Sequence, residues 1–342
     1  MLMRAMVLSE YNRPLALEQR EVPEPGPGEV LVKIEACGIC GTDLKISTGI
    51  LPGTRLPLVM GHEPAGTVAR VGSAVKDLEP GDRVCVHFYV TCGRCAWCRG
   101  GRESICPNLV GQLGFHLDGG FAEYLTVPAD NCLKVPAEVS FSGAAILGDA
   151  VATGYHAVQR AGVKPGQLVL VMGAGGVGLH LVQMAKVAGA CVAVVDVDEA
   201  RLDLARRLGA DHAVRFEAQD YLAQVGKLAG GEPVSAVFET VGLPETLAAN
   251  VRLLGRGGKL MVIGYKPGHV FPLDPLDCVN REIEVRGVRA SCKEELRATI
   301  KLVAAGNVVP VITREFALPE VNAALAELKA GRITGRAVVL PG

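Results

Sequence analysis

In the first 150 residues, hydrophobic positions are gathered in short runs separated by turn residues. Val30–Ile34, Gly66–Val71 and Arg83–Val86 are β-prone, and pairs such as Pro52-Gly53 mark turns between such runs. The first ten residues have the pattern of a further strand. This pattern predicts a β-rich, barrel-like domain over residues 1–150.

From residue 151 to 288 the pattern changes to alternating strands and helices. Leu168–Met172 is a continuous apolar run typical of a strand buried on both faces, and apolar residues between Val177 and Ala188 recur at helical spacing. The strand–helix pair is repeated at Cys191–Val195 and Glu199–Leu208. Further strands are expected at Val234–Phe238, Lys259–Ile263 and Glu282–Val288. This alternation predicts a parallel, doubly wound sheet in an α/β protein.

The last 54 residues, 289–342, combine helical and strand patterns. Helices are expected around Glu294–Ala304 and Leu318–Ala330, and a final strand near Arg336–Leu340.

The composition is that of an ordinary globular protein. Apolar residues make up 49% of the 342 residues, charged residues 21%, and the formal net charge is −1. A nearly neutral chain does not attract nucleic acid or an anionic membrane surface over long range, so we expect neither as a partner. No apolar stretch reaches the ~18 residues of a membrane span, and the start shows no export signal. We therefore expect a cytoplasmic protein, in which cysteines are more often metal ligands or buried residues than disulfides.

A glycine motif follows the expected strand Leu168–Met172. It is Gly173-Ala174-Gly175-Gly176-Val177-Gly178, and its position between strand and helix is that of a dinucleotide-binding turn. Asp196 ends the next strand, where a carboxylate accepts hydrogen bonds from ribose hydroxyls and repels a 2′-phosphate, so NAD is predicted rather than NADP. Arg201 lies near enough in sequence to contact the ribose or to face solvent. The alternative interpretation of the glycine motif is a glycine-rich turn that binds no ligand.

Four cysteines lie within fifteen residues, at Cys92, Cys95, Cys98 and Cys106. Four thiolates at this spacing can close a tetrahedral site without an open position, which predicts a structural zinc ion. The alternatives are an iron–sulfur cluster and a redox dithiol. The seven-residue gap before the last cysteine and the expected coenzyme fold argue against the cluster.

Two further segments carry candidate chemistry, Cys37-Gly38-Ile39-Cys40-Gly41-Thr42-Asp43 and Gly61-His62-Glu63-Pro64-Ala65-Gly66-Thr67-Val68. Together with the four cysteines and the glycine motif, in this order, they resemble the zinc-containing medium-chain alcohol dehydrogenases. The resemblance covers essentially the whole chain. It implies a GroES-like catalytic domain over residues 1–150, a Rossmann coenzyme domain over 151–288, and a return of 289–342 to the catalytic domain. Chain length and the acidic third ligand are similar to the bacterial and archaeal tetrameric members, so a homotetramer is expected.

The resemblance also implies roles for individual residues. Cys40 and His62 match the catalytic zinc ligands, and Asp149 falls at the position of the third, with a helix N-cap as the alternative interpretation. Asp43 matches the carboxylate that orients His62. The remaining matches are Glu63, a glutamate that approaches the metal during ligand exchange, and Thr42, the hydroxyl that takes the substrate proton, with a strand hydroxyl as the alternative.

Coenzyme contacts and one departure follow from the same resemblance. Backbone groups of Ile263, Gly264 and Tyr265 would lie beside the nicotinamide, and Arg336 matches an arginine that contacts pyrophosphate. Many relatives continue the proton relay through a histidine where this chain has Lys45. A protonated lysine cannot act as a base unless desolvation lowers its pKa, so water is the alternative outlet.

These features predict a reversible, NAD-dependent oxidation of an alcohol, of secondary or polyol type, to a carbonyl compound, with two zinc ions per chain. The small-molecule alcohol or carbonyl substrate is expected to bind between the two domains. The alternatives are an enone or quinone reductase of the same superfamily, and a nucleotide-binding sensor or structural protein without turnover.

Overall fold

The chain forms two compact units, which are described separately. The computed structural model describes residues 1–217, 220–228 and 233–342. The first unit comprises Met1–Ala152, Ser291–Gly306 and Pro310–Gly342, and the second comprises Thr153–Ala290 and Asn307–Val309. The main boundaries lie two residues beyond those predicted at 150/151 and 288/289. The three residues 307–309, which belong to the second unit, lie inside the segment expected to belong wholly to the first.

The first unit is built on a mixed sheet with the strand order β10-β6-β5-β3-β18-β17, and β9 also pairs with β3. Its strands are β3 (Glu29–Ile39), β5 (Glu63–Val71), β6 (Arg83–Val86), β9 (Tyr124–Pro128), β10 (Cys132–Lys134), β17 (Ile312–Ala317) and β18 (Arg336–Leu340). The long strand β3 is apolar and almost wholly buried, which makes it the centre of this unit.

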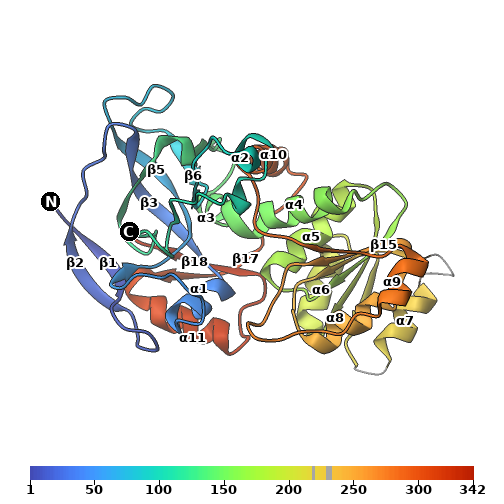
Figure 1. Cartoon of the computed structure of the whole chain (residues 1–342). Helices are drawn as coiled ribbons and strands as arrows, with labels where there is room; N and C mark the ends of the chain where they lie inside the picture. The colour runs from blue at the N-terminus through green and yellow to red at the C-terminus, as the bar shows by residue number, and fades with distance from the viewer. Residues whose placement is uncertain (218–219, 229–232) are drawn as a thin grey trace. The chain divides into compact units, whose positions relative to one another are not determined.

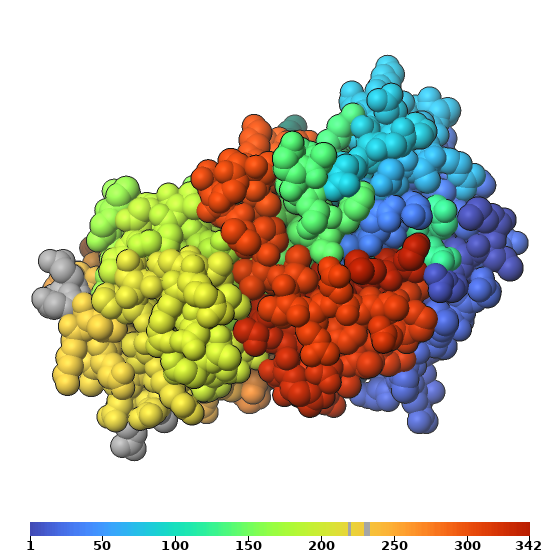
Figure 2. Space-filling model, turned by 180° about the vertical axis from the view of Figure 1, so that it is seen from behind, coloured from blue at the N-terminus to red at the C-terminus, as the bar shows by residue number. Residues whose placement is uncertain are grey.

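Pairing between β3 and β18 places the last strand of the chain beside a strand from its first forty residues. The strands run antiparallel, with Ala337 opposite Ile39 and Val339 opposite Cys37. Figure 1 shows the red strands β17 and β18 beside the blue β3, and in Figure 2 the red surface of the C-terminal residues adjoins the blue surface of N-terminal ones. As a result, Arg336 lies next to the end of β3 from which Cys40 continues.

Smaller elements complete the first unit. A second sheet has the order β2-β1-β4 and a hairpin pairs β7 with β8. Their bounds are β1 (Leu2–Leu8), β2 (Ala16–Glu21), β4 (Leu58–Val59), β7 (Tyr89–Val90) and β8 (Gly111–Gln112). The helices are α1 (Gly41–Ser47), α2 (Ala96–Arg99), α3 (Phe141–Ile146), α10 (Lys293–Ala304) and α11 (Val321–Lys329), and a π-helical segment, Leu147–Val151, follows α3 directly. Short 3-10 turns lie at Glu103–Ile105, Ala129–Asn131 and Leu318–Glu320.

The second unit contains a parallel sheet with the order β13-β12-β11-β14-β15-β16. Its strands are β11 (Leu168–Met172), β12 (Cys191–Asp196), β13 (His212–Arg215), β14 (Val234–Glu239), β15 (Leu254–Val262) and β16 (Glu284–Gly287). The helices are α4 (Ala152–Ala161), of which only the first residue belongs to the first unit, α5 (Gly176–Val187), α6 (Glu199–Arg207), α7 (Tyr221–Leu228), α8 (Pro244–Val251) and α9 (Pro275–Arg281). The order reverses between β11 and β14, and in open parallel sheets a ligand binds at the carboxyl ends of the strands at such a point.

The structure corrects several sequence predictions. Helix α11 begins at Val321 rather than Leu318, because Pro319 is accommodated in a separate 3-10 turn. Strand β15 begins five residues before the predicted Lys259 and passes through a bulge opposite β14. Helix α1 was not predicted, and Thr42 therefore lies on a helix and not on a strand. In the described part of the chain, no helix is both long enough and apolar enough to cross a bilayer.

Candidate active site

Cys40 is fixed at the junction between β3 and α1. It is the N-cap of α1, where its Sγ accepts a hydrogen bond from the Thr42 amide at 3.5 Å. The Asp43 carboxylate accepts a hydrogen bond from the Cys40 amide at 2.8 Å, which completes a reciprocal cap. Since the helix start depends on these bonds, the local fold holds the thiol and Asp43 together.

His62 is buried immediately before β5 and faces the same region. Asp43 Oδ1 lies 3.0 Å from His62 Nδ1, so the other ring nitrogen, Nε2, is left to face Cys40 and Asp149. The ring of Phe88 packs edge-on against the His62 ring, with centroids 5.3 Å apart. Burial lowers the pKa of His62, but Asp43 and Asp149 raise it, and the net pKa is well above its ordinary value. The surroundings therefore favour a cation at this ring, which a bound metal can supply in place of a proton.

Asp149 enters the same region from the π-helical segment. Its Oδ2 lies 3.5 Å from Cys40 Sγ and 3.9 Å from His62 Nε2. The residue lies within a helical run whose N-cap is Ser140, so the N-cap interpretation of Asp149 is wrong. Burial raises the pKa of Asp149, but contacts with His62 and Arg336 outweigh this effect and the net pKa is well below the usual range. An ionised carboxylate thus faces the thiol and the imidazole.

Glu63 is fully buried beside them at the start of β5. Neither oxygen of its carboxylate has a hydrogen-bond partner, although Oε1 lies 3.3 Å from Arg336 Nη2. Burial raises the pKa of Glu63 well above its usual range, against the opposing effect of the Arg336 charge. The carboxylate fits only because residue 38 is glycine, since a Cβ there would lie 2.2 Å from Glu63 Oε2.

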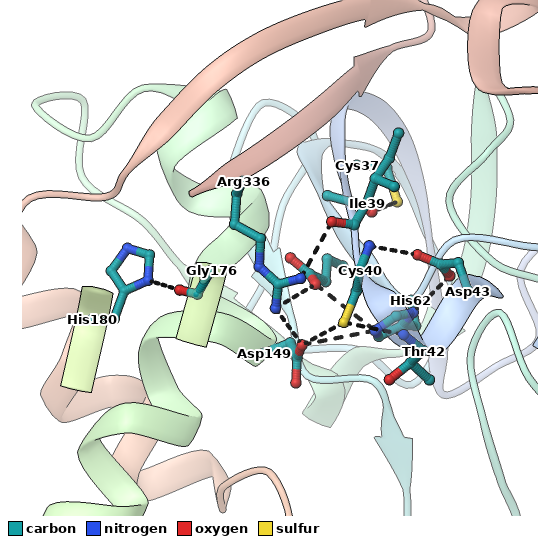
Figure 3. A network of polar contacts seen from close by, with 12 residues as sticks. Cys37, Ile39, Cys40, Thr42, Asp43, His62, Asp149, Gly176, His180 and Arg336 are labelled. Carbon is teal, nitrogen blue, oxygen red and sulfur yellow. Dashed lines mark hydrogen bonds and ion pairs between the residues drawn. The ribbon is translucent and has the colours of Figure 1, made fainter. Parts of the chain in front are cut away.

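These four groups form a cluster suited to a metal ion. One ligand atom from each of Cys40, His62, Glu63 and Asp149 lies within 4.8 Å of the others, and we refer to them as the Cys40 cluster. Figure 3 shows Cys40, His62 and Asp149 pointing toward one another. Thiolate, imidazole and carboxylate are the ligands that zinc takes, and neither oxygen of the buried Glu63 carboxylate has a hydrogen-bond partner. The residues therefore fit a zinc ion.

Thr42 and Lys45 lie on α1, next to Cys40 in sequence. Both are partly buried, and they are three residues apart, which places them on neighbouring turns of one helix face. Burial lowers the pKa of Lys45, and the nearby Cys40 opposes that effect. The direction is the one that a lysine needs in order to accept a proton near neutral pH.

The four cysteines between residues 92 and 106 lie close together. Neighbouring sulfurs are 3.4 Å (Cys95–Cys98), 3.5 Å (Cys92–Cys106), 3.8 Å (Cys95–Cys106) and 3.9 Å (Cys92–Cys98) apart. Zinc–sulfur bonds of about 2.3 Å in a tetrahedron require sulfurs about 3.8 Å apart. Backbone hydrogen bonds lower the pKa of Cys92 to about 6, while burial raises that of Cys98 to about 12. The spacing fits a single zinc ion closed in by four thiols.

The glycine motif of the second unit has the geometry of a phosphate-binding turn. Gly173 follows β11 with φ of 94°, and a Cβ at Gly178 would lie 1.8 Å from the Gly173 carbonyl oxygen. Gly175 is the N-cap of α5, which begins at Gly176-Val177, and a Cβ at Gly175 would meet no other atom within 4 Å. Protein packing therefore explains the glycines at 173 and 178, whereas the backbone at Gly175 lies open to the approach of a ligand.

Asp196 is buried at the end of β12, beside the glycine motif. Its Oδ2 accepts a hydrogen bond from the Ala174 amide at 2.6 Å, and its Oδ1 accepts one from the Asp198 amide at 2.9 Å. A carboxylate has about four lone-pair positions, so it retains capacity for ribose hydroxyls. Arg201 Nη1 lies 4.0 Å from Asp196 Oδ1, which places the arginine at the same carboxylate.

The predicted nicotinamide segment follows β15. The amides of Ile263 and Gly264 both donate to the Glu239 carbonyl oxygen at 2.9 Å, so these two groups are already used within the sheet. A Cβ at Gly264 would lie 2.2 Å from the Thr240 carbonyl oxygen, which means that the loops after β14 and β15 are in close contact. Tyr265 is 46% exposed. This segment can therefore offer carbonyl groups to a ligand, but not the amides of Ile263 and Gly264.

Comparison with known proteins agrees with this geometry. The family model for the alcohol dehydrogenase GroES-like domain matches residues 26–137, and that for the zinc-binding dehydrogenase domain matches residues 176–305. An NAD-dependent alcohol dehydrogenase of Sulfurisphaera tokodaii is 34% identical over 99% of this chain and 100% of its own length. The chain belongs to the zinc-containing medium-chain alcohol dehydrogenase family.

Solved structures of family members are similar over the whole chain. The alcohol dehydrogenase of Aeropyrum pernix is 36% identical with a TM-score of 0.92, covering 99% of this chain and 100% of the other. A zinc-binding dehydrogenase of Sinorhizobium meliloti, solved with NADP, is 34% identical with a TM-score of 0.91, and each chain is covered completely. The relatives thus include a protein named as NAD-dependent and one solved with NADP.

Sequence reasoning missed two features of the Cys40 cluster. Arg336, predicted to contact pyrophosphate, donates to Asp149 Oδ2 at 2.8 Å and is buried among the cluster residues. Its predicted contact with the coenzyme stays a prediction, and no local sequence signal indicated the contact with Asp149. Gly38 was part of a quoted motif without a role, although a glycine inside an otherwise bulky strand is a recognised sign of close approach.

Proposed function

We propose that this protein is an NAD-linked, zinc-dependent alcohol dehydrogenase that interconverts a secondary alcohol or polyol with its carbonyl compound. The observation that carries the proposal is the convergence of ligand atoms of Cys40, His62 and Asp149 within 4.8 Å of one another, beside a buried Glu63 without hydrogen bonds. These three residues would hold a catalytic zinc ion. When bound, zinc supplies Lewis-acid polarisation of the substrate oxygen, and NAD supplies the hydride acceptor.

The protein's own groups orient the ligands and exclude water. Asp43 holds His62 through Nδ1, which fixes the ring so that Nε2 faces the cluster. Phe88 packs edge-on against the His62 ring, and in this proposal it borders the substrate site. Phe115, which is partly buried, and the segment Ile50-Leu51 are further candidates to border the substrate.

Thr42 takes the proton of the substrate hydroxyl in this proposal. Its amide donates to Cys40 Sγ, so its position is tied to that of the ligand. Lys45 on the next turn of α1, with its pKa lowered by burial, would carry the proton onward. A Lys45→Met enzyme should then lose turnover mainly at higher pH, where the parent Lys45 amine is neutral and can accept the proton, and an unchanged pH profile would restore water as the outlet.

The coenzyme is NAD in this proposal, because Asp196 lies buried at the end of β12 and remains beside any ribose bound to the glycine motif. A 2′-phosphate would be placed against this carboxylate. The charge of Arg201 attracts a phosphate, but Arg201 already lies at Asp196, and the negative charge of Asp196 reduces that attraction.

We also propose a second, structural zinc ion on Cys92, Cys95, Cys98 and Cys106. The support is the agreement of the sulfur separations with a zinc tetrahedron. Replacing Cys95 by serine should lower the metal content by one ion per chain and lower the unfolding temperature, because structural zinc contributes directly to folding. Intact protein with a single zinc per chain would contradict this assignment.

A coenzyme-coupled screen of alcohols and ketones tests the main proposal. Nicotinamide absorbance is followed with NAD and NADP, in protein that is untreated, chelated, and reloaded with zinc. Turnover that disappears on chelation and returns with zinc is expected. Zinc-independent reduction of enones or quinones would favour the reductase alternative, and coenzyme binding without turnover on any substrate would favour a sensor.

We further propose a cytoplasmic homotetramer. The eleven cysteines are free thiols, which suits a reducing compartment. In the second unit, Val270 and, on α9, Leu276 and Val279 are 86%, 66% and 74% exposed, and β16 is the last strand of the described parallel sheet. Exposed apolar side chains and an open sheet edge each favour association. Sedimentation should give a tetramer, and Val279→Asp should reduce the assembly. A monomeric parent protein would overturn this part.

A further inference from the structure

The Arg336 side chain is a buried cation inside the Cys40 cluster. Arg336 begins β18 and is 5% exposed. Its Nη2 lies 2.8 Å from Asp149 Oδ2 and 3.3 Å from Glu63 Oε1, and its Nη1 lies 3.3 Å from the Ile39 carbonyl oxygen. Figure 3 shows the guanidinium pointing at Asp149 beside the Cys40 thiol. An arginine is always charged, so a positive charge stands permanently among the candidate ligands.

The contact with Asp149 uses the oxygen that faces the other ligands. Asp149 Oδ2 accepts from Arg336 and is also the atom that lies 3.5 Å from Cys40 Sγ and 3.9 Å from His62 Nε2. A metal ion held by these groups would share or displace this hydrogen bond. The guanidinium and the metal therefore compete for the same carboxylate oxygen.

We propose that Arg336 is a built-in counter-cation, which neutralises Asp149 while the cluster holds no metal and thereby sets how tightly zinc binds. This inference rests on the proposed zinc-dependent function. Buried carboxylates without a cation are strongly destabilising, so Arg336 keeps the ligands assembled in the metal-free protein. The same charge repels an incoming zinc ion at short range and makes metal uptake weaker than it would be with an uncharged residue at 336.

A purely structural role predicts something different. The bond from Arg336 to the Ile39 carbonyl ties β18 to β3, and this bond serves metal-free and metal-loaded protein alike. Loss of it would lower the unfolding temperature equally in both states and leave the zinc affinity unchanged. The two roles therefore predict different results when the metal-free protein is compared with the zinc-loaded protein.

The experiment uses the full-length enzyme with Arg336→Met, Arg336→Lys and a matched control, Arg83→Met. Arg83 lies on β6 of the same unit, where it donates to the Val139 carbonyl oxygen at 2.6 Å and stacks on Phe141, so it serves packing away from the Cys40 cluster. Zinc content is measured against free zinc fixed by a chelator buffer. The zinc-binding step that the parent shows and the Cys40→Ser variant lacks is assigned to the catalytic site. Unfolding temperatures are recorded with excess chelator and with zinc.

Arg336→Met should bind zinc at the Cys40-dependent step at least tenfold more tightly than the parent, and its unfolding temperature should fall more in chelator than in zinc. Arg336→Lys, which keeps the charge, should stay within about threefold of the parent. The Arg83→Met control should lower both unfolding temperatures equally without changing the zinc step.

Unchanged or weaker zinc binding in Arg336→Met would overturn the inference. If that variant does not fold in chelator, adding Asp149→Asn removes the unpaired carboxylate and should restore folding, and failure of this rescue would also overturn it. Absence of any Cys40-dependent zinc step in the parent would instead refute the proposed function, so the two failures are distinguishable.

Discussion

A methyl group added at Gly38 should disturb the Cys40 cluster through Glu63. Gly38 lies opposite Glu63 in the β3–β5 pair. A Cβ at Gly38 would lie 2.2 Å from Glu63 Oε2, 2.8 Å from Cδ and 2.9 Å from Cβ. Because the Glu63 Cβ is also too close, rotation of the far end of the side chain does not remove the overlap. Either the carboxylate leaves its position beside Arg336 or the two strands separate.

The expected cost follows from the overlap. Forcing extra atoms into a packed interior destabilises by about 1–3 kcal/mol. For a domain of this size, each kcal/mol lowers the unfolding temperature by roughly 2–4 °C. Gly38→Ala should therefore melt roughly 2–12 °C below the parent, and it should hold less zinc at the Cys40-dependent step because Glu63 and its neighbours are displaced.

Gly41→Ala supplies the matched control for this measurement. Gly41 is the first residue of α1, and a Cβ there would meet no other atom within 4 Å. Alanine is the better helix former by roughly 0.5–1 kcal/mol, so this variant should melt at or slightly above the parent temperature. Adding Glu63→Ala to Gly38→Ala should recover part of the lost stability. If Gly38→Ala melts like Gly41→Ala with full zinc content, Glu63 does not lie against Gly38 and the description of the cluster is wrong.

Three further predictions concern Asp149, Asp196 and His87. Asp149→Asn should reduce turnover by two or more orders of magnitude and lower zinc occupancy at the Cys40-dependent step, since an amide is a poorer ligand than a carboxylate; full activity and zinc content would remove Asp149 from the ligand set. Asp196→Gly should shift the preference from NAD toward NADP by at least a decade in relative affinity, about 1.4 kcal/mol, whereas a parent enzyme that prefers NADP would refute the coenzyme assignment. Burial lowers the pKa of His87, so the unfolded chain, with a histidine pKa of about 6.5, binds a proton there that the native protein does not. Stability should then fall as the pH drops through about 6.5, by up to about 1.4 kcal/mol per pH unit, and His87→Gln should flatten this fall; equal slopes in unfolding experiments between pH 7 and 5.5 would contradict it.

The fold was most predictable where local pattern and tertiary packing agree. Leu168–Met172 coincides with β11 because a strand buried on both faces must be apolar throughout. Helix α6 ends one residue before the predicted Leu208, and Gly209 follows with φ of 103°. Helix α1, in contrast, has only seven residues and begins through the hydrogen bonds between Cys40 and Asp43. Its short sequence has no apolar periodicity to recognise, so it was missed.

The same distinction applies to the candidate site. Motif residues such as Cys40 and His62 could be identified because the chemistry of a ligand is carried by its residue type and spacing. The position of Arg336 could not be predicted, since it depends on the pairing of β18 with β3, and its bond to Ile39 joins residues 297 positions apart. The residues around Cys40 in the sequence do not indicate which distant strand will place a charge beside it.

The two candidate zinc sites differ in how their geometry is specified. The four cysteines come from one short segment, so their separations depend mainly on local turns and on helix α2, which Cys95 caps. The Cys40 cluster draws on the end of β3, the start of β5 and the π-helical segment, and its counter-charge comes from β18. A substitution that shifts one of these elements therefore also shifts a ligand or its counter-charge. Metal affinity at the Cys40 cluster is therefore the more sensitive reporter of distant packing, and the four-cysteine site is the more robust one.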